Sequence, residues 1–211
     1  MEDFQQAIKC FEQAVQEDPT YARAYAGLAD SYALLGGYST YPQKQFTPKA
    51  GAAALKALQL DDNLAEAHVS LALIAQNYDW DWKTAEQEYR QAIQLDPNYA
   101  TAHHLFAEFL SYQGRFEESF EEIERARLLD PLSLIIASDE GAIYYYSRQY
   151  DRAIAEFRSV LYMDPTFQRA RLIIFPYVEA GEAAKGLAEI QRWPKPDDDP
   201  WKLMLKTYRV H

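Results

Sequence analysis

Apolar and small residues recur along this chain with a helical spacing, in pairs of segments. In the second segment of each pair, a small residue is followed four positions later by an apolar one, and three positions later usually by another small one. Such residues share one face of a helix, where small side chains let a neighbouring helix approach closely. The sets are Ala7, Phe11 and Ala14; Ala50, Ala54 and Ala57; Ala85, Tyr89 and Ala92; Ser119, Ile123 and Ala126; and Ala153, Phe157 and Val160.

An Asp-Pro dipeptide marks the end of most of these second helices. It occurs at Asp18-Pro19, Asp96-Pro97, Asp130-Pro131 and Asp164-Pro165, and Asp61-Asp62 takes its place once. The last three prolines follow one another at steps of 34 residues. A proline is tolerated at a turn or a helix start, and the preceding aspartate can cap the next helix or form the turn. The chain therefore reads as a repeat of helix pairs.

The pattern resembles the tetratricopeptide repeat (TPR), a 34-residue unit in which large–x2–Leu–small–x2–large precedes Ala–x3–Phe–x2–Ala and a proline. The resemblance implies an all-α fold, a right-handed superhelical solenoid of antiparallel helix pairs. We expect the array over residues 1–193 and a linker with a truncated helix over 194–211. The units are a partial repeat at 1–21, repeats at 22–64, 65–99, 100–133 and 134–167, and a degenerate repeat at 168–193.

Several helix boundaries follow from local signals. Gly36-Gly37 should end the first helix of the 22–64 repeat, and Thr47-Pro48 should start the second with a cap and a first-turn proline. Residues 37–47 would then form an insertion of about nine residues relative to the 34-residue period. Pro176 should kink or break the first helix of the degenerate repeat. Both ends of the chain fall within a repeat, so we expect it to be a part of a larger protein.

In TPR proteins the first helix of each pair lines a concave groove, and the resemblance implies which residues face it here. The alternative for any of these positions is an ordinary solvated helix face. The Lys and Asn residues with which one TPR subclass holds a peptide carboxylate are absent, because Ala26 and Asp30, or Val69 and Leu73, take their positions. The candidate binding residues are Arg23, Asp30, Glu66, Gln76, His104, Glu108, Ser111 and Tyr145.

Aromatic residues gather at two places outside the regular pattern. Tyr78, Trp80 and Trp82 alternate with aspartates at the corner between two helices. They form either an exposed contact patch or the filling of the corner, since aromatic residues serve both purposes. The insertion at 37–47 contains Tyr38, Tyr41 and Phe46 and leaves the same two possibilities open. We favour a recognition element there, because long ordered loops tend to be functional.

The sequence offers little for catalysis or metal binding. His104 and Glu108 are four residues apart and could share a metal ion, but two ligands do not make a site. Glu117, Glu118, Glu121, Glu122 and Glu124 give an acidic helix face, which without a nucleophile or an oxyanion hole reads as solvated surface. We expect no enzymatic activity, no metal and no cofactor. Cys10 is the single cysteine, so no disulfide can form within the chain.

Composition narrows the class of partner. The formal charge of −11 disfavours nucleic acids and anionic lipid surfaces, whereas the 48% hydrophobic content allows a buried core. We therefore expect a protein or peptide partner, no direct nucleic acid contact and no membrane insertion by this segment. Self-association through the truncated ends is a further possibility. The expected compartment is the cytoplasm, or the periplasm if a membrane span precedes this segment in the full protein.

Longer runs extend the resemblance beyond the generic repeat. YAGLADSYALLGGY, YDWDWKTAEQEYRQAIQLDPNYATAHH and YYYSRQYDRAIAEF are similar to the C-terminal TPR region of bacterial signalling proteins. In those proteins a winged-helix DNA-binding domain or a serine/threonine kinase domain precedes the repeats. The resemblance implies a partner-binding, regulatory scaffold. The two alternatives are a structural or self-associating element without a dedicated peptide ligand, and a small-molecule sensor.

Overall fold

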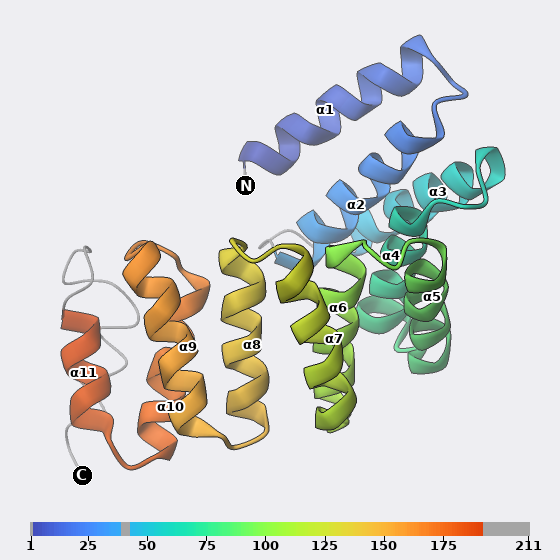
Figure 1. The fold of residues 1–211 in the computed structure, drawn as a ribbon. Coiled ribbons are helices and arrows are strands. Elements are labelled where there is room, and N and C mark those ends of the chain that lie inside the picture. Colours follow the sequence, from blue (N-terminus) through green and yellow to red (C-terminus); the bar gives the residue numbers. More distant parts are fainter. Residues whose placement is uncertain (1, 39–42, 192–211) are drawn as a thin grey trace. The chain divides into compact units, whose positions relative to one another are not determined.

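The computed structural model describes residues 2–38 and 43–191, and within them every regular element is a helix (Figure 1). This confirms the all-α prediction. The predicted linker and final helix at 194–211 lie outside the described residues, as does Tyr41 of the insertion.

The helices alternate between first and second members of successive pairs. The chain starts with a second helix, α1 (Glu2–Glu17), as the spacing of Ala7, Phe11 and Ala14 predicts. The first helices are α2 (Ala22–Tyr38), α4 (Ala65–Ile74), α6 (Ala100–Tyr112), α8 (Leu134–Tyr146) and α10 (Ile174–Glu179). The other second helices are α3 (Gln43–Leu60), α5 (Trp82–Leu95), α7 (Phe116–Leu129), α9 (Tyr150–Met163) and α11 (Ala183–Gln191). The π-helical turn η1 (Ala75–Asp79) extends α4, and the 3₁₀ segment η2 (Arg169–Ile173) precedes α10.

The chain divides into two compact units, Met1–Phe109 and Leu110–His211, at a point inside α6. In the first unit α2 packs against α1, α3 and α4, and α4 packs against α5. In the second unit α8 packs against α7, α9 and η2, and α10 packs against α11. The first helices α2 and α4 thus contact each other in the first unit, and in the second unit α8 contacts η2, the segment that leads into α10. This is the stacking that helix-pair repeats use to bury their apolar faces.

The small–large–small sets form the core, as predicted. Ala85, Tyr89 and Ala92 on α5 are fully buried, and the equivalent Ala153, Phe157 and Val160 on α9 are too. The first helices offer small residues to these large side chains. An added Cβ at Gly141 would come within 3.1 Å of the Phe157 ring, and one at Gly27 within 2.4 Å of the Phe11 ring.

The recurrent aspartates form turns between pairs. The carboxylates of Asp18 and Asp164 accept hydrogen bonds from the backbone N–H of Thr20 and Thr166, two residues later, each at 2.8 Å. Asp61 and Asp96 accept from Asn63 and Asn98 in the same way, at 3.0 and 2.9 Å. These are Asx-turns, in which the side chain replaces a backbone acceptor. Of the two roles predicted for the aspartates, the turn is therefore the one observed at these four positions.

Two predicted helix boundaries are wrong. α2 continues through Gly36-Gly37 to Tyr38, and α3 begins at Gln43 rather than at Pro48, which lies inside the helix. The earlier start brings Phe46 onto the core, where its ring stacks on Tyr32 with centroids 6.2 Å apart. We attribute the longer helix to this packing, since an internal proline costs about 3 kcal/mol and must be outweighed by tertiary contacts.

The prediction for Pro176 is confirmed. Proline lacks the N–H that a regular helix needs, and its ring clashes with the carbonyl four residues earlier. The chain passes from the 3₁₀ segment η2 into the six-residue helix α10 just before Pro176, instead of forming one long first helix. Tyr177, directly after the proline, is buried and packs in the same core as Phe157.

Replacing the large core residue of a pair should weaken its unit far more than replacing an exposed aromatic residue on the same helix. We expect Phe157→Ala to lower the free energy of unfolding by about 3–5 kcal/mol, because it leaves a cavity among fully buried neighbours. Tyr162, also on α9, is 90% exposed, and Tyr162→Ala should change stability by less than about 0.5 kcal/mol. Urea unfolding followed by circular dichroism measures both, and equal losses would contradict the core assignment.

Candidate functional site

Six of the predicted groove residues lie in the first unit, and the four on α2, α4 and η1 differ in burial. Arg23 on α2 is exposed, whereas Asp30 on α2 and Glu66 on α4 are half-buried. Gln76, in η1, is buried, and its side-chain oxygen accepts a hydrogen bond from the Tyr89 hydroxyl at 3.0 Å. Gln76 therefore has a structural part in holding Tyr89, which its spacing in the sequence did not indicate.

The charges of Asp30 and Glu66 both act on Tyr99, a residue that the repeat pattern did not mark as a candidate. Burial raises the pKa of the Tyr99 hydroxyl, and the negative charges of Asp30, Glu66 and Asp96 raise it further. A hydrogen bond with Thr101 acts in the opposite direction. Two carboxylates from successive first helices thus lie near one phenol at the start of α6, and we call Asp30, Glu66 and Tyr99 the acidic site.

The Asp30 carboxylate is the most perturbed group of the acidic site. Burial raises its pKa to about 6. At neutral pH it is still mostly ionised, so the first unit holds a negative charge in a poorly solvated position. Buried charges are usually paired, and strongly perturbed carboxylates are concentrated at functional sites. A cationic group brought by a partner would relieve this unfavourable burial.

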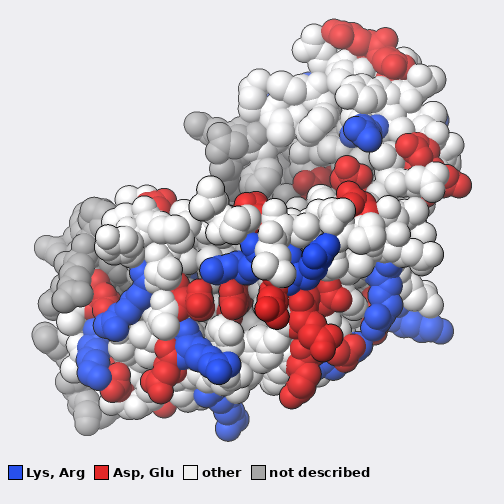
Figure 2. All heavy atoms as spheres, in the orientation of Figure 1, with Lys and Arg blue, Asp and Glu red and all other residues white. Residues whose placement is uncertain are grey.

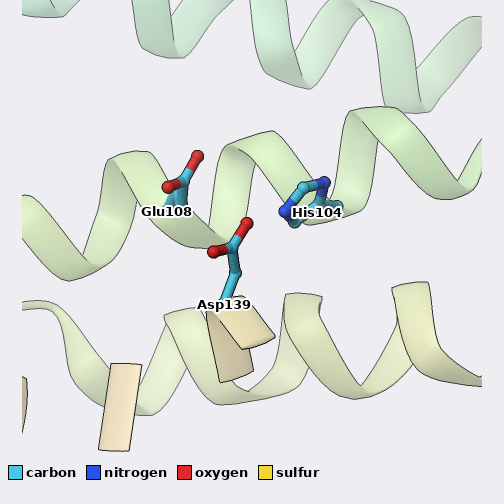
Figure 3. A group of neighbouring side chains, drawn as sticks. All are labelled: His104, Glu108 and Asp139. Carbon is cyan, nitrogen blue, oxygen red and sulfur yellow. The ribbon is translucent and has the colours of Figure 1, made fainter. Parts of the chain in front are cut away.

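The predicted residues of α6 lie on one side of that helix. Figure 3 shows the side chains of His104 and Glu108 projecting from α6 one turn apart. His104 and Ser111 are buried, and Glu108 is half-buried. Asp139, drawn in the same figure, lies on α8 in the second unit, where it is 1% exposed and pairs with the Arg169 guanidinium.

Tyr145, the predicted groove residue on α8, lies at the centre of an aromatic cluster. Its ring centroid is 5.6 Å from that of Tyr146, 6.2 Å from Tyr150 and 6.1 Å from Phe175. A surface depression of about 360 Å³ opens over this cluster. Its lining residues are Tyr145, Tyr146, Arg148, Tyr150 and Glu179.

The corner at Tyr78, Trp80 and Trp82 combines the two roles that the sequence left open. Trp82 packs against Phe109, with ring centroids 5.7 Å apart, and is 36% exposed. Trp80 is 70% exposed. Its contact role remains a prediction. In the insertion, Phe46 is a packing residue.

The backbone at Trp80 belongs to a recurrent left-handed position between the two helices of a pair. Gly114 and Gly181 have φ values of 73° and 75° there, and Trp80 and Arg148 have 56° and 61°. Glycine adopts this conformation without steric cost, whereas other residues lose about 1–2 kcal/mol. Two corners therefore carry a large, exposed side chain where glycine would be more stable, and such strained positions tend to be retained for function.

The acidic face predicted on α7 is present and solvated. Glu117, Glu121 and Glu124 are exposed, while Ser119 and Ile123 are buried on the other side of the helix. Figure 2 shows acidic side chains gathered over α7 on the face in view. At the start of the helix, Glu118 pairs with Arg115 at 2.6 Å. No helix in the described part of the chain has the length and apolar character needed to cross a membrane.

Comparison with known protein families matches the tetratricopeptide repeat over residues 1–21. Among curated proteins the chain is 32% identical, over 116 residues, to the type IV pilus assembly protein PilF of Pseudomonas aeruginosa, covering 50% of this chain and 45% of PilF. It is 28% identical, over 150 residues, to the transcriptional regulator HilA of Salmonella typhimurium, covering 71% of this chain and 27% of HilA. The chain thus spans less than half the length of these relatives.

Solved structures share the fold at low sequence identity. A human IFIT1 dimer with PPP-AAAA superposes with a TM-score of 0.77 at 22% identity, covering 95% of this chain and 48% of IFIT1. YrrB, described as a TPR protein with an unusual peptide-binding site, superposes with a TM-score of 0.60 at 19% identity, covering 95% of this chain and all of YrrB. The predicted fold class, a TPR solenoid, is confirmed.

Asp30 should make the stability of the first unit depend on pH in a defined window. Its pKa is about 6 in the folded state and about 3.9 in an unfolded chain, so stability falls as the pH rises from about 4 to 6. Between these two pH values the free energy of unfolding should fall by roughly 2–3 kcal/mol, and Asp30→Asn should remove this fall. Urea unfolding at intervals from pH 4 to 7 compares the two proteins, and parallel curves would contradict the raised pKa.

Glycine at the Trp80 corner should stabilise the protein. Trp80→Gly removes the strain of the left-handed backbone conformation but makes the unfolded chain more flexible. The free energy of unfolding should therefore rise by up to about 1 kcal/mol. Trp80→Ala keeps the strain and should give no gain. Thermal unfolding distinguishes the two variants, and equal stability would show that the corner is unstrained.

Proposed function

Because the chain has the fold of a tetratricopeptide-repeat solenoid, we propose that it is a non-catalytic scaffold. It would hold a partner protein or peptide against the faces of its first helices. The observation that carries the proposal is the acidic site on α2, α4 and the start of α6. There a half-buried Asp30 carboxylate with a pKa near 6 lies with Glu66 around Tyr99.

The chemistry of the acidic site favours a basic partner segment. Three carboxylates raise the pKa of one phenol, so the local potential is negative, and the net charge of −11 extends that sign to the whole chain. A lysine or arginine side chain placed near Asp30 would make a charge-assisted hydrogen bond in a poorly solvated position, where such bonds are strongest. Arg23 precedes Asp30 on α2 and is exposed, so it could contact an acidic residue of the same partner.

Within a full-length protein, we propose a regulatory role. The similarity to HilA, a transcriptional regulator, extends over 150 residues and agrees with the resemblance of the sequence to repeat regions of bacterial signalling proteins. In such an arrangement the repeats would recruit a partner, and another part of the protein would produce the response.

A nucleic acid ligand is disfavoured. IFIT1 carries PPP-AAAA in its structure, but the likeness to this chain is one of fold at 22% identity. An acidic first-helix face repels phosphates, since binding to a nucleic acid backbone depends on releasing counterions through Lys and Arg. The acidic site has the opposite charge.

The test is affinity capture followed by a binding measurement with matched variants. The full chain is used as bait in a lysate of its organism, and the captured protein is purified and titrated by calorimetry. Asp30→Asn should weaken binding about tenfold, equivalent to 1.4 kcal/mol. Asp62→Asn removes the same charge from an exposed turn and should leave the affinity unchanged.

Three outcomes would contradict the proposal. The full chain could capture no protein, the two variants could weaken binding equally, or Asp30→Asn could have no effect. Equal weakening would point to long-range charge rather than to contact at the acidic site.

A further inference from the structure

We propose that the depression at the corner of α8 and α9 is a subsite for one cationic side chain, arginine or lysine, of the bound partner. The inference rests on the proposed function and adds to it a second contact point of stated chemistry, in the second unit. The tyrosine rings, the carboxylate and the volume of the depression carry it.

Three of the five residues that line the depression are tyrosines. Tyr145 is half-buried at the centre, and Tyr146, 44% exposed, and Tyr150 surround it at centroid distances of 5.6 and 6.2 Å. The faces of aromatic rings are electron-rich and attract cations within about 6 Å, with a strength of about 0.5–2 kcal/mol. Several rings around a hollow form the kind of cage that binds ammonium and guanidinium groups.

A carboxylate completes this environment. Glu179, at the end of α10, lines the same depression and is exposed. It lies close enough to Tyr145 for its charge to contribute to raising the pKa of that hydroxyl, after the larger effect of burial. A guanidinium group resting on the tyrosines could therefore pair with Glu179. The volume of about 360 Å³ is sufficient for the end of one long side chain.

Arg148 also lines the depression, and its positive charge opposes a bound cation. It is exposed and lies at the left-handed corner position between α8 and α9. It lines this depression and also a neighbouring one, together with Gln149 and Arg152. Charge at an exposed rim is screened by water and salt. We expect Arg148 to moderate the affinity for a cation, and its removal should increase that affinity.

The probe is the blocked tripeptide Ac-Gly-Arg-Gly-NH₂, titrated into the full chain and followed by ¹H–¹⁵N NMR. Its control has citrulline in place of arginine, which keeps the shape and removes the charge. The arginine peptide should shift the amides of Tyr145, Tyr146 and Glu179 and bind about fivefold more tightly than the citrulline peptide. Equal binding of the two peptides, or tighter binding of Ac-Gly-Glu-Gly-NH₂, would overturn the proposal.

Four variants test the roles of the lining residues. Glu179→Gln and Tyr146→Leu, both at exposed positions, should each lower the affinity for the arginine peptide about fivefold. Arg148→Gly should raise that affinity. Glu121→Gln removes the same charge from an exposed position on α7 and should have no effect. If Glu179→Gln and Glu121→Gln bind alike, the carboxylate has no part in recognition and the proposal fails.

The subsite and the proposed function fail in different experiments. In one case a partner is captured and Asp30→Asn weakens its binding, but Glu179→Gln and Tyr146→Leu do not. The subsite is then wrong and the scaffold function stands. If the arginine peptide binds as expected but the full chain captures no protein, the proposed function is wrong and the tyrosine cage remains as a site for a basic ligand.

Discussion

The structure depends on one kind of contact: the large apolar side chain of a second helix packed against small residues of a neighbouring helix. The Phe157 ring lies so near Gly141 that a single added carbon would touch it at 3.1 Å. This closeness requires small residues at fixed steps, which is why alanine, glycine and serine recur on the inner faces. Each helix pair completes its core with its neighbour, so the sequence must repeat for the fold to be stable.

A stack of this kind leaves one face of its first helices and the corners between helices available to a partner, and at these places some residues reduce stability. Asp30 keeps a carboxylate in a poorly solvated position, and Trp80 and Arg148 occupy backbone positions where glycine would be less strained. Each of these features costs free energy in the isolated chain. Their location on surfaces that can receive a partner, and not in the core, is what links the fold to the proposed scaffold function.

The periodic part of the structure could be predicted because it is local: a spacing of four and three residues specifies a helical face. The boundaries of α2 and α3 could not, since the packing of Phe46 on Tyr32 outweighs the glycine and proline signals. The pairing of Asp139 with Arg169 and the grouping of Asp30 with Tyr99 join residues far apart in sequence. A usable signal existed for Trp80 and Arg148, because each is 34 residues from Gly114, whose glycine marks the left-handed corner.

Site-specific photo-crosslinking tests the central claim, that a partner binds the first-helix faces, most directly. A benzoylphenylalanine would replace Arg23, exposed on α2, in one protein and Gln87, exposed on the second helix α5, in another. After irradiation with the captured partner, the account predicts a crosslinked product from position 23 and none from position 87. A product from position 87 alone would contradict it, because the partner would then bind the second-helix surface.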